Sequence, residues 1–218
     1  MNLVNICAVL FLLFFSSINV IQAAKVLSSE PNGKTVLQLE DDEIAIFGYG
    51  SLMLEEQLHE PHYNGPFIQA ELDGFKRSWS VRYPNRRDIE IEDPEGELFK
   101  PKSITYLNIE PCTDCKVNGM IFISSADYLE SYDDRESSYD RIKINDDLLN
   151  ISVIGGNSYA YTAKPSHYYP TSETTSPKDT VILGYYVDII EDALEAQGEE
   201  FATEYDNSSQ PVPKQIVF

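Results

Sequence analysis

A buried strand that ends in a glycine-rich loop is the feature that most constrains this chain. The apolar run Ile44–Phe47 is followed directly by Gly48-Tyr49-Gly50-Ser51-Leu52. Glycine permits backbone angles and close approaches that other residues exclude, so Gly48 and Gly50 allow amide N–H groups to converge on a carboxylate or a carbonyl oxygen. Taken alone, such a segment is more often a tight turn with packing glycines. A binding role therefore needs support from elsewhere in the chain.

The first 24 residues have the composition of a secretory signal. An apolar stretch covers about Ile6–Phe15, and the small residues Ala23 and Ala24 follow it. The stretch is shorter than the roughly 20 residues of a membrane-spanning helix. We therefore expect a signal peptide at 1–24 and a secreted or otherwise extracytoplasmic protein. We expect no stable membrane association after cleavage; an uncleaved anchor is the alternative.

The rest of the chain is long enough for one domain. Without the signal, about 195 of the 218 residues remain, too few for two comfortable domains. Residues 25–43 are polar and rich in turn formers, so we expect a leader there that joins the domain through Val36–Leu39. The expected domain covers 44–206, with a core that begins at Ile44, and a polar tail covers 207–218.

The charge of the chain excludes two classes of partner. The formal net charge is −20 at pH 7. Such a surface repels nucleic acid and anionic membranes, so neither is an expected partner. The acidic residues are scattered rather than set at ligand spacing, and no metal site is expected.

Two cysteines remain after the signal, because Cys7 lies within it. Cys112 and Cys115 stand in the turn-rich sequence Pro-Cys-Thr-Asp-Cys. In an oxidising compartment such a pair favours a short structural disulfide. A redox centre is the alternative, but redox pairs of this spacing normally open a helix after a strand, which is not the pattern here. In a eukaryotic secretory context, Asn150 and Asn207 begin candidate glycosylation sequons.

Apolar alternation predicts many short strands. They are expected at 67–72, 75–83, 104–109, 117–123, 139–144, 148–154 and 159–163. The segments on either side of the cysteines could pair as a hairpin, and the charged stretch 84–102 is expected to be a surface loop or hairpin.

Two helical patterns accompany these strands. A short helix is expected to be capped by Ser124 and to run into Asp133–Glu136. A longer helix is expected over 180–197, and a further turn over 199–205. One face of the longer helix carries Ile182, Tyr185, Ile189, Ala193 and Ala196. The fold class is therefore α+β.

Glu136 is the second residue of interest, because it ends the short helix. Asp133 and Asp134 precede it, and Tyr139 follows. Crowded carboxylates raise one another's pKa, and a carboxylate in a partly dry cleft can transfer protons near neutral pH. An acidic helix end solvated by water is the alternative, and composition alone favours it.

Two motifs, in this order, resemble the gamma-glutamylcyclotransferase superfamily, which includes the ChaC-type proteins. The first is Phe47-Gly48-Tyr49-Gly50-Ser51-Leu52, and the second is Leu129-x4-Asp134-Arg135-Glu136-x2-Tyr139. Segments 104–111 and 117–122 look like the strand and return that precede the family's catalytic helix. The likeness spans about residues 44–145.

The resemblance implies a small mixed β-barrel with flanking helices and a cavity for a gamma-glutamyl group. It implies that four loop residues bind this head group: Tyr49, Gly50, Ser51 and Leu52. Tyr139 is expected either to hydrogen-bond the substrate carboxylate or to pack.

The resemblance also implies a reaction. Glu136 would be the catalytic acid/base that takes a proton from the substrate's α-ammonium. The freed amine then attacks the γ-carbonyl and closes a ring, which gives 5-oxoproline, while loop amides stabilise the developing oxyanion. No cofactor is implied, and the expected partner is a small gamma-glutamyl substrate.

The sequence leaves open the role of its basic residues, the identity of the substrate and the choice between rival functions. A basic island of Arg77, Arg82, Arg86 and Arg87 either attracts an anionic peptide or compensates surface charge. The export signal, the cysteine pair and the charged stretch depart from the family pattern, which puts substrate identity in doubt more than reaction type. A non-catalytic binding domain and a redox enzyme are the rival functions.

Overall fold

The computed structural model of the chain describes residues 25–27, 34–58, 63, 65–170 and 178–218. The signal peptide expected at 1–24 lies outside the described residues.

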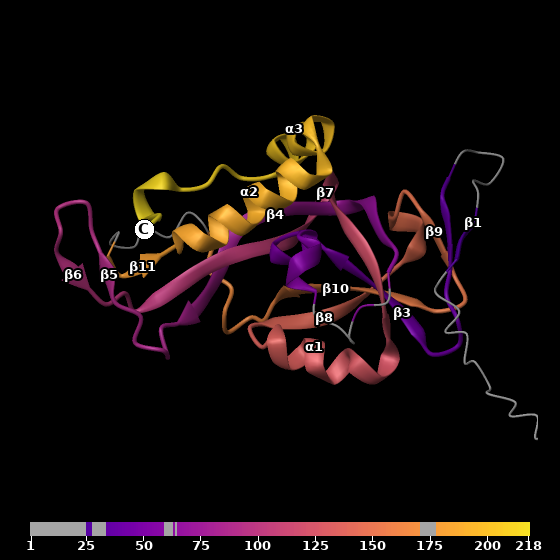
Figure 1. Cartoon of the computed structure of the whole chain (residues 1–218), viewed down its shortest axis with the longest axis horizontal. Helices are drawn as coiled ribbons and strands as arrows, with labels where there is room; N and C mark the ends of the chain where they lie inside the picture. Colours follow the sequence, from indigo (N-terminus) through magenta and orange to yellow (C-terminus); the bar gives the residue numbers. More distant parts are fainter. Residues whose placement is uncertain (1–24, 28–33, 59–62, 64, 171–177) are drawn as a thin grey trace, which may run out of the picture.

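Two long antiparallel strands dominate the fold (Figure 1). β4 covers Phe67–Pro84 and β7 covers Ser103–Ser125, and they pair with each other over most of their length. On its other side, β7 pairs antiparallel with β3 (Glu43–Gly48), whose residues are all buried. The start of β7 also pairs in parallel with the short β11 (Thr180–Val181).

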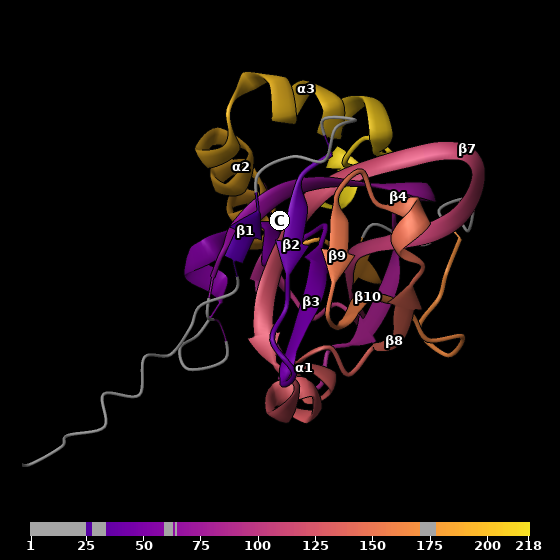
Figure 2. The same cartoon turned by 90° about the vertical axis from the view of Figure 1, so that its right-hand side faces the viewer.

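The same sheet continues beyond β3. β10 (Asn157–Ala163) runs parallel to β3, and β8 (Tyr139–Ile144) closes the far edge antiparallel to β10. Together with β4 and β11 these strands form a mixed six-stranded sheet that curls into a half-barrel (Figure 2). The expected α+β fold with a small mixed barrel is confirmed in this form.

Two small sheets flank the half-barrel. β2 (Val36–Gln38) lies between β1 (Lys25–Leu27) and β9 (Ser152–Ile154). The charged stretch forms a hairpin as expected, from β5 (Ile91–Glu92) and β6 (Leu98–Phe99).

The core begins before Ile44. Leu37 and Leu39 are fully or almost fully buried in the main hydrophobic cluster. They reach it because β2 pairs in parallel with β9, which turns alternate side chains of the leader toward the sheet.

The two strand segments beside the cysteines do not form a hairpin, which corrects the expectation. Both belong to β7, and both pair with β4. Between the two paired segments, residues 112–115 of β7 are extra residues that have no partner in β4, and only Gly74 lies opposite them. Asp114 has φ +60° and Gly74 has φ +83° at this irregularity. The segments expected at 67–72 and 75–83 therefore merge into β4.

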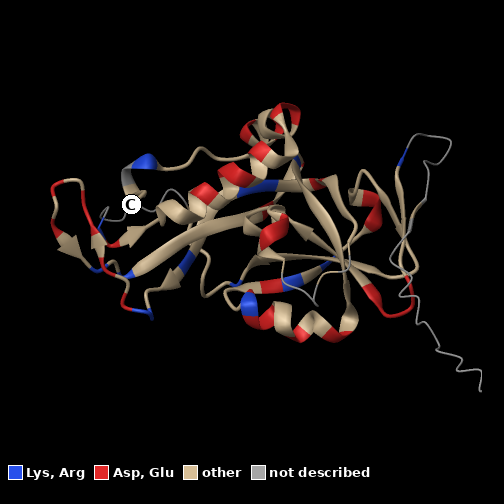
Figure 3. Cartoon of the chain, viewed as in Figure 1, with Lys and Arg blue, Asp and Glu red and all other residues tan. Residues whose placement is uncertain are grey.

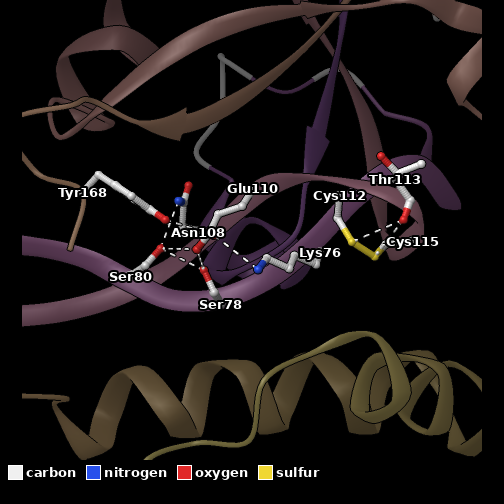
Figure 4. A network of polar contacts seen from close by, with 9 residues as sticks. All are labelled: Lys76, Ser78, Ser80, Asn108, Glu110, Cys112, Thr113, Cys115 and Tyr168. Atoms are coloured by element: carbon white, nitrogen blue, oxygen red, sulfur yellow. Dashed lines mark hydrogen bonds and ion pairs between the residues drawn. A yellow bond between two sulfur atoms is a disulfide. The ribbon is translucent and has the colours of Figure 1, made fainter. Parts of the chain in front are cut away.

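A polar network ties β4 to β7 beyond this irregularity (Figure 4). The hydroxyls of Ser78 and Ser80 both contact Oε1 of Glu110, at 2.8 Å for Ser80. Asn108 donates from Nδ2 to the Ser80 oxygen over 3.1 Å, and the Tyr168 hydroxyl reaches Glu110 Oε2 at 3.2 Å. The register of β4 shifts just after Ser78, and the network supplies polar partners to this irregular segment.

Helix α1 (Leu129–Arg135) follows a turn of 3₁₀ helix, η3 (Ala126–Tyr128). Ser125 caps this helical segment, because its hydroxyl accepts the N–H of Asp127 at 3.3 Å. The expected cap at Ser124 is therefore wrong by one residue. The strand expected over 148–154 is also shorter: η4 (Asp146–Leu148) comes first, Leu149 forms a single β-bridge with Leu72, and β9 is the strand that follows.

Two helices cover the long strands. α2 (Gly184–Gln197) begins later than expected, and α3 (Glu199–Ser208) follows directly. The buried face of α2 carries Tyr186, Ile190 and Ala193, whereas Tyr185 is 57% exposed. No helix of the described ranges is long and apolar enough to cross a membrane.

Ala193 is buried as expected, whereas the expected core positions 185 and 189 are displaced by one residue, to Tyr186 and Ile190. Apolar residues stand in adjacent pairs at 185–186 and 189–190, so sequence periodicity fits either face. Packing selects one of them, because the Tyr186 ring lies edge-on against Tyr106 and Trp79, with centroids 5.0 and 6.0 Å away.

The C-terminal segment lies against the domain. η5 (Lys214–Ile216) is followed by Val217, which forms a β-bridge with Ile182, and the Phe218 ring packs edge-on against Phe99.

Candidate active site

A cavity of about 670 Å³ opens between the half-barrel and helix α2. Its walls come from the end of β3, the short helix η1 (Ser51–Met53), the end of β4, the start of β7, the residues after α1, and α2. Both sequence motifs meet here, because Tyr49–Leu52, Glu136 and Tyr139 all line this cavity. The curled sheet brings together segments that are far apart in the sequence.

Hydrogen bonds of Tyr49 anchor the glycine loop to the rest of the domain. The Tyr49 side chain is buried, and its hydroxyl donates to the carbonyl of Tyr161 over 2.6 Å. The Tyr49 carbonyl in turn accepts from Nε of Arg77 at 2.9 Å. These contacts fix the backbone where it enters the cavity wall.

The loop then leads into η1, whose first two residues, Ser51 and Leu52, line the cavity. Met53 donates its N–H to the Gly50 carbonyl at 2.9 Å, whereas the first N–H groups of a helical turn have no partner within it. A Cβ on Gly50 would lie 2.9 Å from the Tyr186 hydroxyl, and one on Gly48 would lie 2.6 Å from the Leu52 Cβ. Both positions therefore require glycine for close approach.

Glu136 is held rigidly where α1 ends. Its N–H donates to the Tyr132 carbonyl, and its own carbonyl accepts from the N–H of Tyr139, each at 2.8 Å. The side chain is 16% exposed, and its Oε1 lies 3.2 Å from Nε of Arg135. Arg135 is itself fixed by donating to the Gln57 carbonyl over 2.8 Å.

Burial raises the pKa of Glu136, and the Arg135 guanidinium partly offsets this effect. The expectation that neighbouring carboxylates raise it is wrong. Asp133 points elsewhere, since it pairs with Arg141 at 3.0 Å and accepts the Tyr161 hydroxyl at 3.0 Å. Glu136 is therefore a desolvated carboxyl group that contacts one cation, which suits a group that exchanges protons near neutral pH.

Tyr139 uses its hydroxyl within the protein. The group donates to the Leu107 carbonyl over 2.8 Å, while the ring faces the cavity. Burial raises the pKa of Tyr139 and of Tyr49 well above the ordinary tyrosine range. Both side chains are therefore neutral at physiological pH.

Sequence reasoning missed most of the aromatic wall. Half of the 14 tyrosines in the chain line the cavity, including Tyr83, Tyr106, Tyr161, Tyr185 and Tyr186. Their high number was the one available signal. This number could not show which tyrosines converge, because the seven come from the loop after β3 and from five separate elements: β4, β7, β8, β10 and α2.

The four arginines of the basic island lie in different environments in the structure. Arg77 is fully buried, which corrects its expected place on the surface. Arg82 packs over the Tyr169 ring at 4.7 Å. Arg86 and Arg87 line the cavity.

Cys112 and Cys115 form a disulfide, with their Cα atoms 5.4 Å apart (Figure 4). Neither cysteine lines the cavity. Across the described part of the chain, no group of three or more His, Cys, Asp or Glu residues is placed to hold a metal ion.

No protein-family model matches this sequence, and no curated protein matches it. Several solved structures, however, are similar to the structure of this chain. The structure of a gamma-glutamyl cyclotransferase is similar over 78% of this chain and 90% of its own, with a TM-score of 0.50 and 16% identity. An uncharacterized human protein matches over 79% of this chain and 90% of its own, with a TM-score of 0.51 and 16% identity.

Identities this low show the fold alone. The chain therefore has the same fold as these two solved structures, one of which is a gamma-glutamyl cyclotransferase.

Proposed function

We propose that this chain is a gamma-glutamylcyclotransferase-type enzyme. It converts a gamma-glutamyl group to 5-oxoproline and releases an amine, an amino acid or a peptide. The observation that carries the proposal is that the Tyr49–Leu52 loop and the desolvated Glu136 carboxyl group line the same cavity. The fold agrees with this activity but does not by itself imply it.

The first step is deprotonation of the substrate. The Glu136 carboxylate takes a proton from the α-ammonium of the gamma-glutamyl group, which frees the nitrogen lone pair. The cavity holds the flexible glutamyl chain folded, so that its own amine meets its own side-chain carbonyl. Such intramolecular positioning can supply roughly 7–11 kcal/mol of the barrier.

Ring closure and release follow. The amine attacks the γ-carbonyl carbon, and the N–H groups at the start of η1 stabilise the negative charge that develops on oxygen. When the intermediate collapses, the γ-amide C–N bond breaks. Glu136 returns its proton to the departing nitrogen, which regenerates the carboxylate in each turnover. The ring nitrogen loses the second proton of the former ammonium group to solvent, so the product is the neutral lactam.

The same cavity could serve a binding protein without catalysis. The desolvated carboxyl group of Glu136 lines the cavity together with the loop and has a raised pKa. This favours the enzyme, because carboxyl groups with shifted pKa values are concentrated at catalytic sites. A redox function of the cysteine pair has weaker support, since both cysteines lie outside the cavity.

Incubation of the mature protein with glutathione, gamma-glutamyl-alanine and gamma-glutamyl-lysine tests the proposal. We expect time-dependent 5-oxoproline from at least one substrate, measured by chromatography against heat-denatured protein. The absence of 5-oxoproline with all three would contradict the enzyme assignment for these substrates.

The pH dependence of kcat/KM should reflect the ionisation of the Glu136 carboxyl group. Because the reaction begins with its carboxylate form, kcat/KM should rise with pH through the raised pKa of Glu136. In Arg135→Gln the cation that lowers this pKa is lost, so the acidic limb should move to higher pH. Arg141→Gln is the matched control, since Arg141 pairs with Asp133 outside the cavity and should leave the limb in place. A limb that moves to lower pH in Arg135→Gln would contradict this assignment.

We also propose that residues 1–24 direct export and are removed. N-terminal sequencing of protein recovered from the medium of expressing eukaryotic cells tests this. A mature protein that still begins at Met1 would contradict it.

A further inference from the structure

The cavity differs in charge from the rest of the molecule. The chain carries −20 overall, and acidic residues are spread over α1, α2, α3 and the β5–β6 hairpin (Figure 3). The described residues that line the cavity include three cations and two carboxylates: Arg86, Arg87, Arg135, Asp134 and Glu136. A cationic cavity in an acidic protein concentrates anionic ligands relative to the surface around it.

Arg135 does not account for this excess, because it is paired with Glu136. Arg86 and Arg87 do account for it. They follow the end of β4, and their side chains are exposed. Among the described residues, no carboxylate lies within ion-pair distance of either guanidinium.

The surroundings of both arginines place them at the aromatic wall of the cavity. The Arg86 guanidinium lies 5.4 Å from the centroid of the Tyr83 ring. Burial raises the pKa of Tyr106 to about 12, and the positive charge of Arg87 acts against that rise, so Arg87 lies within electrostatic reach of the Tyr106 hydroxyl. Two cations beside tyrosines form a polar surface suited to a carboxylate, which arginine can bind through two parallel hydrogen bonds.

We propose that Arg86 and Arg87 bind a carboxylate on the leaving group, so that gamma-glutamyl amino acids and peptides are preferred over uncharged gamma-glutamyl amines. This inference rests on the proposed function, and it adds the substrate class. The Tyr49–Leu52 loop and Glu136 act on the glutamyl half, whereas Arg86 and Arg87 come from the loop that leads to the β5–β6 hairpin. That hairpin lies in the charged stretch where the sequence departs from the family pattern.

The test compares two substrates that differ in one charge. Gamma-glutamyl-alanine and gamma-glutamyl-alaninamide share the scissile bond and the size of the leaving group, but only the first carries a carboxylate there. For the wild-type protein we expect kcat/KM to be about tenfold higher for the acid, the scale of one charge-assisted hydrogen bond. In the double variant R86Q/R87Q the ratio should fall to about one, through loss of activity on the acid alone.

A matched double variant controls for net charge. Lys100 and Lys143 are exposed and lie outside the cavity, so K100Q/K143Q removes the same two charges without touching the site. It should keep the wild-type preference. Thermal unfolding of both double variants checks that the fold is intact.

The outcomes separate this inference from the proposed function. If the wild-type protein releases 5-oxoproline equally well from both compounds, the inference is wrong and the function stands. If R86Q/R87Q loses activity equally on both compounds, the arginines serve the glutamyl half and the inference is again wrong. If neither compound yields 5-oxoproline, the proposed function fails, and the inference falls with it.

Discussion

Replacing Glu136 with Gln should lower kcat for 5-oxoproline formation by about 10²–10⁴-fold, the usual contribution of a positioned acid/base. The amide has nearly the same shape and can still contact Arg135, but it cannot accept the α-ammonium proton. Because the carboxyl group is desolvated in the folded protein, losing its charge should not destabilise the fold. The measurement is the initial rate of 5-oxoproline release, together with the melting temperature.

Glu130→Gln is the matched control for this substitution. Glu130 lies on the same helix, but it is exposed and does not line the cavity. This variant should keep activity within about twofold of wild type, as expected for a surface change. Equal rates for wild type, Glu136→Gln and Glu130→Gln would contradict the catalytic role of Glu136.

Replacing Arg77 with Met should cause the largest loss of stability of any single arginine substitution. Its guanidinium is fully buried and lies 4.1 Å from the centroid of the Tyr205 ring. It donates to the carbonyls of Tyr49 and Asn118. It also donates to Ser209 Oγ over 2.6 Å. Methionine fills much of the volume but leaves these buried acceptors unpaired. We expect a loss of about 3 kcal/mol in the free energy of unfolding, which corresponds to roughly 6–12 °C in Tm.

Two further variants test the explanation. Lys76→Met changes a 43% exposed cation on the same strand and should cost less than about 1 kcal/mol. Arg77→Lys should not restore stability, because one ammonium group cannot reach Tyr49, Asn118 and Ser209 together. A melting temperature for Arg77→Met equal to that of Lys76→Met would contradict the anchoring role. Because Arg77 holds the Tyr49 carbonyl, the folded fraction of Arg77→Met should also bind substrate more weakly, with a raised KM.

Strand identity was largely readable from the sequence, whereas strand continuity was not. Alternation of side-chain type located β8 at its observed bounds and most of β10, because successive side chains of a strand point to opposite faces of the sheet. The Pro, Cys and Asp residues at 111–115 carry turn chemistry, so they predicted a break. The structure instead continues β7 through these residues, of which 112–115 stand as an irregular, unpaired stretch opposite Gly74, and the ladder with β4 runs on both sides of that stretch. Local propensity favours a break, but the pairing with β4 on both sides of residues 112–115 keeps the two segments in one strand.

The candidate site likewise has some features that local sequence patterns indicate and others that only packing decides. Both motifs were found from sequence, because glycines that close a loop and a carboxylate at a helix end leave a local pattern. Arg77 could not be placed, since an arginine in a polar run is usually exposed and nothing local indicates burial. The origin of the Glu136 pKa was also misread: adjacent acids in sequence suggested crowding, whereas Asp133 points toward Arg141.

The sequence by itself determined the α+β class, most strands and two sets of residues whose order resembles a known superfamily. It could do so because periodicity, glycine placement and charge are local properties. Only the tertiary structure decided that the loop, Glu136, seven tyrosines and two exposed arginines surround one cavity. Their convergence depends on the curl of the sheet and on the face that α2 presents to it, and both are set by packing between segments far apart in the chain.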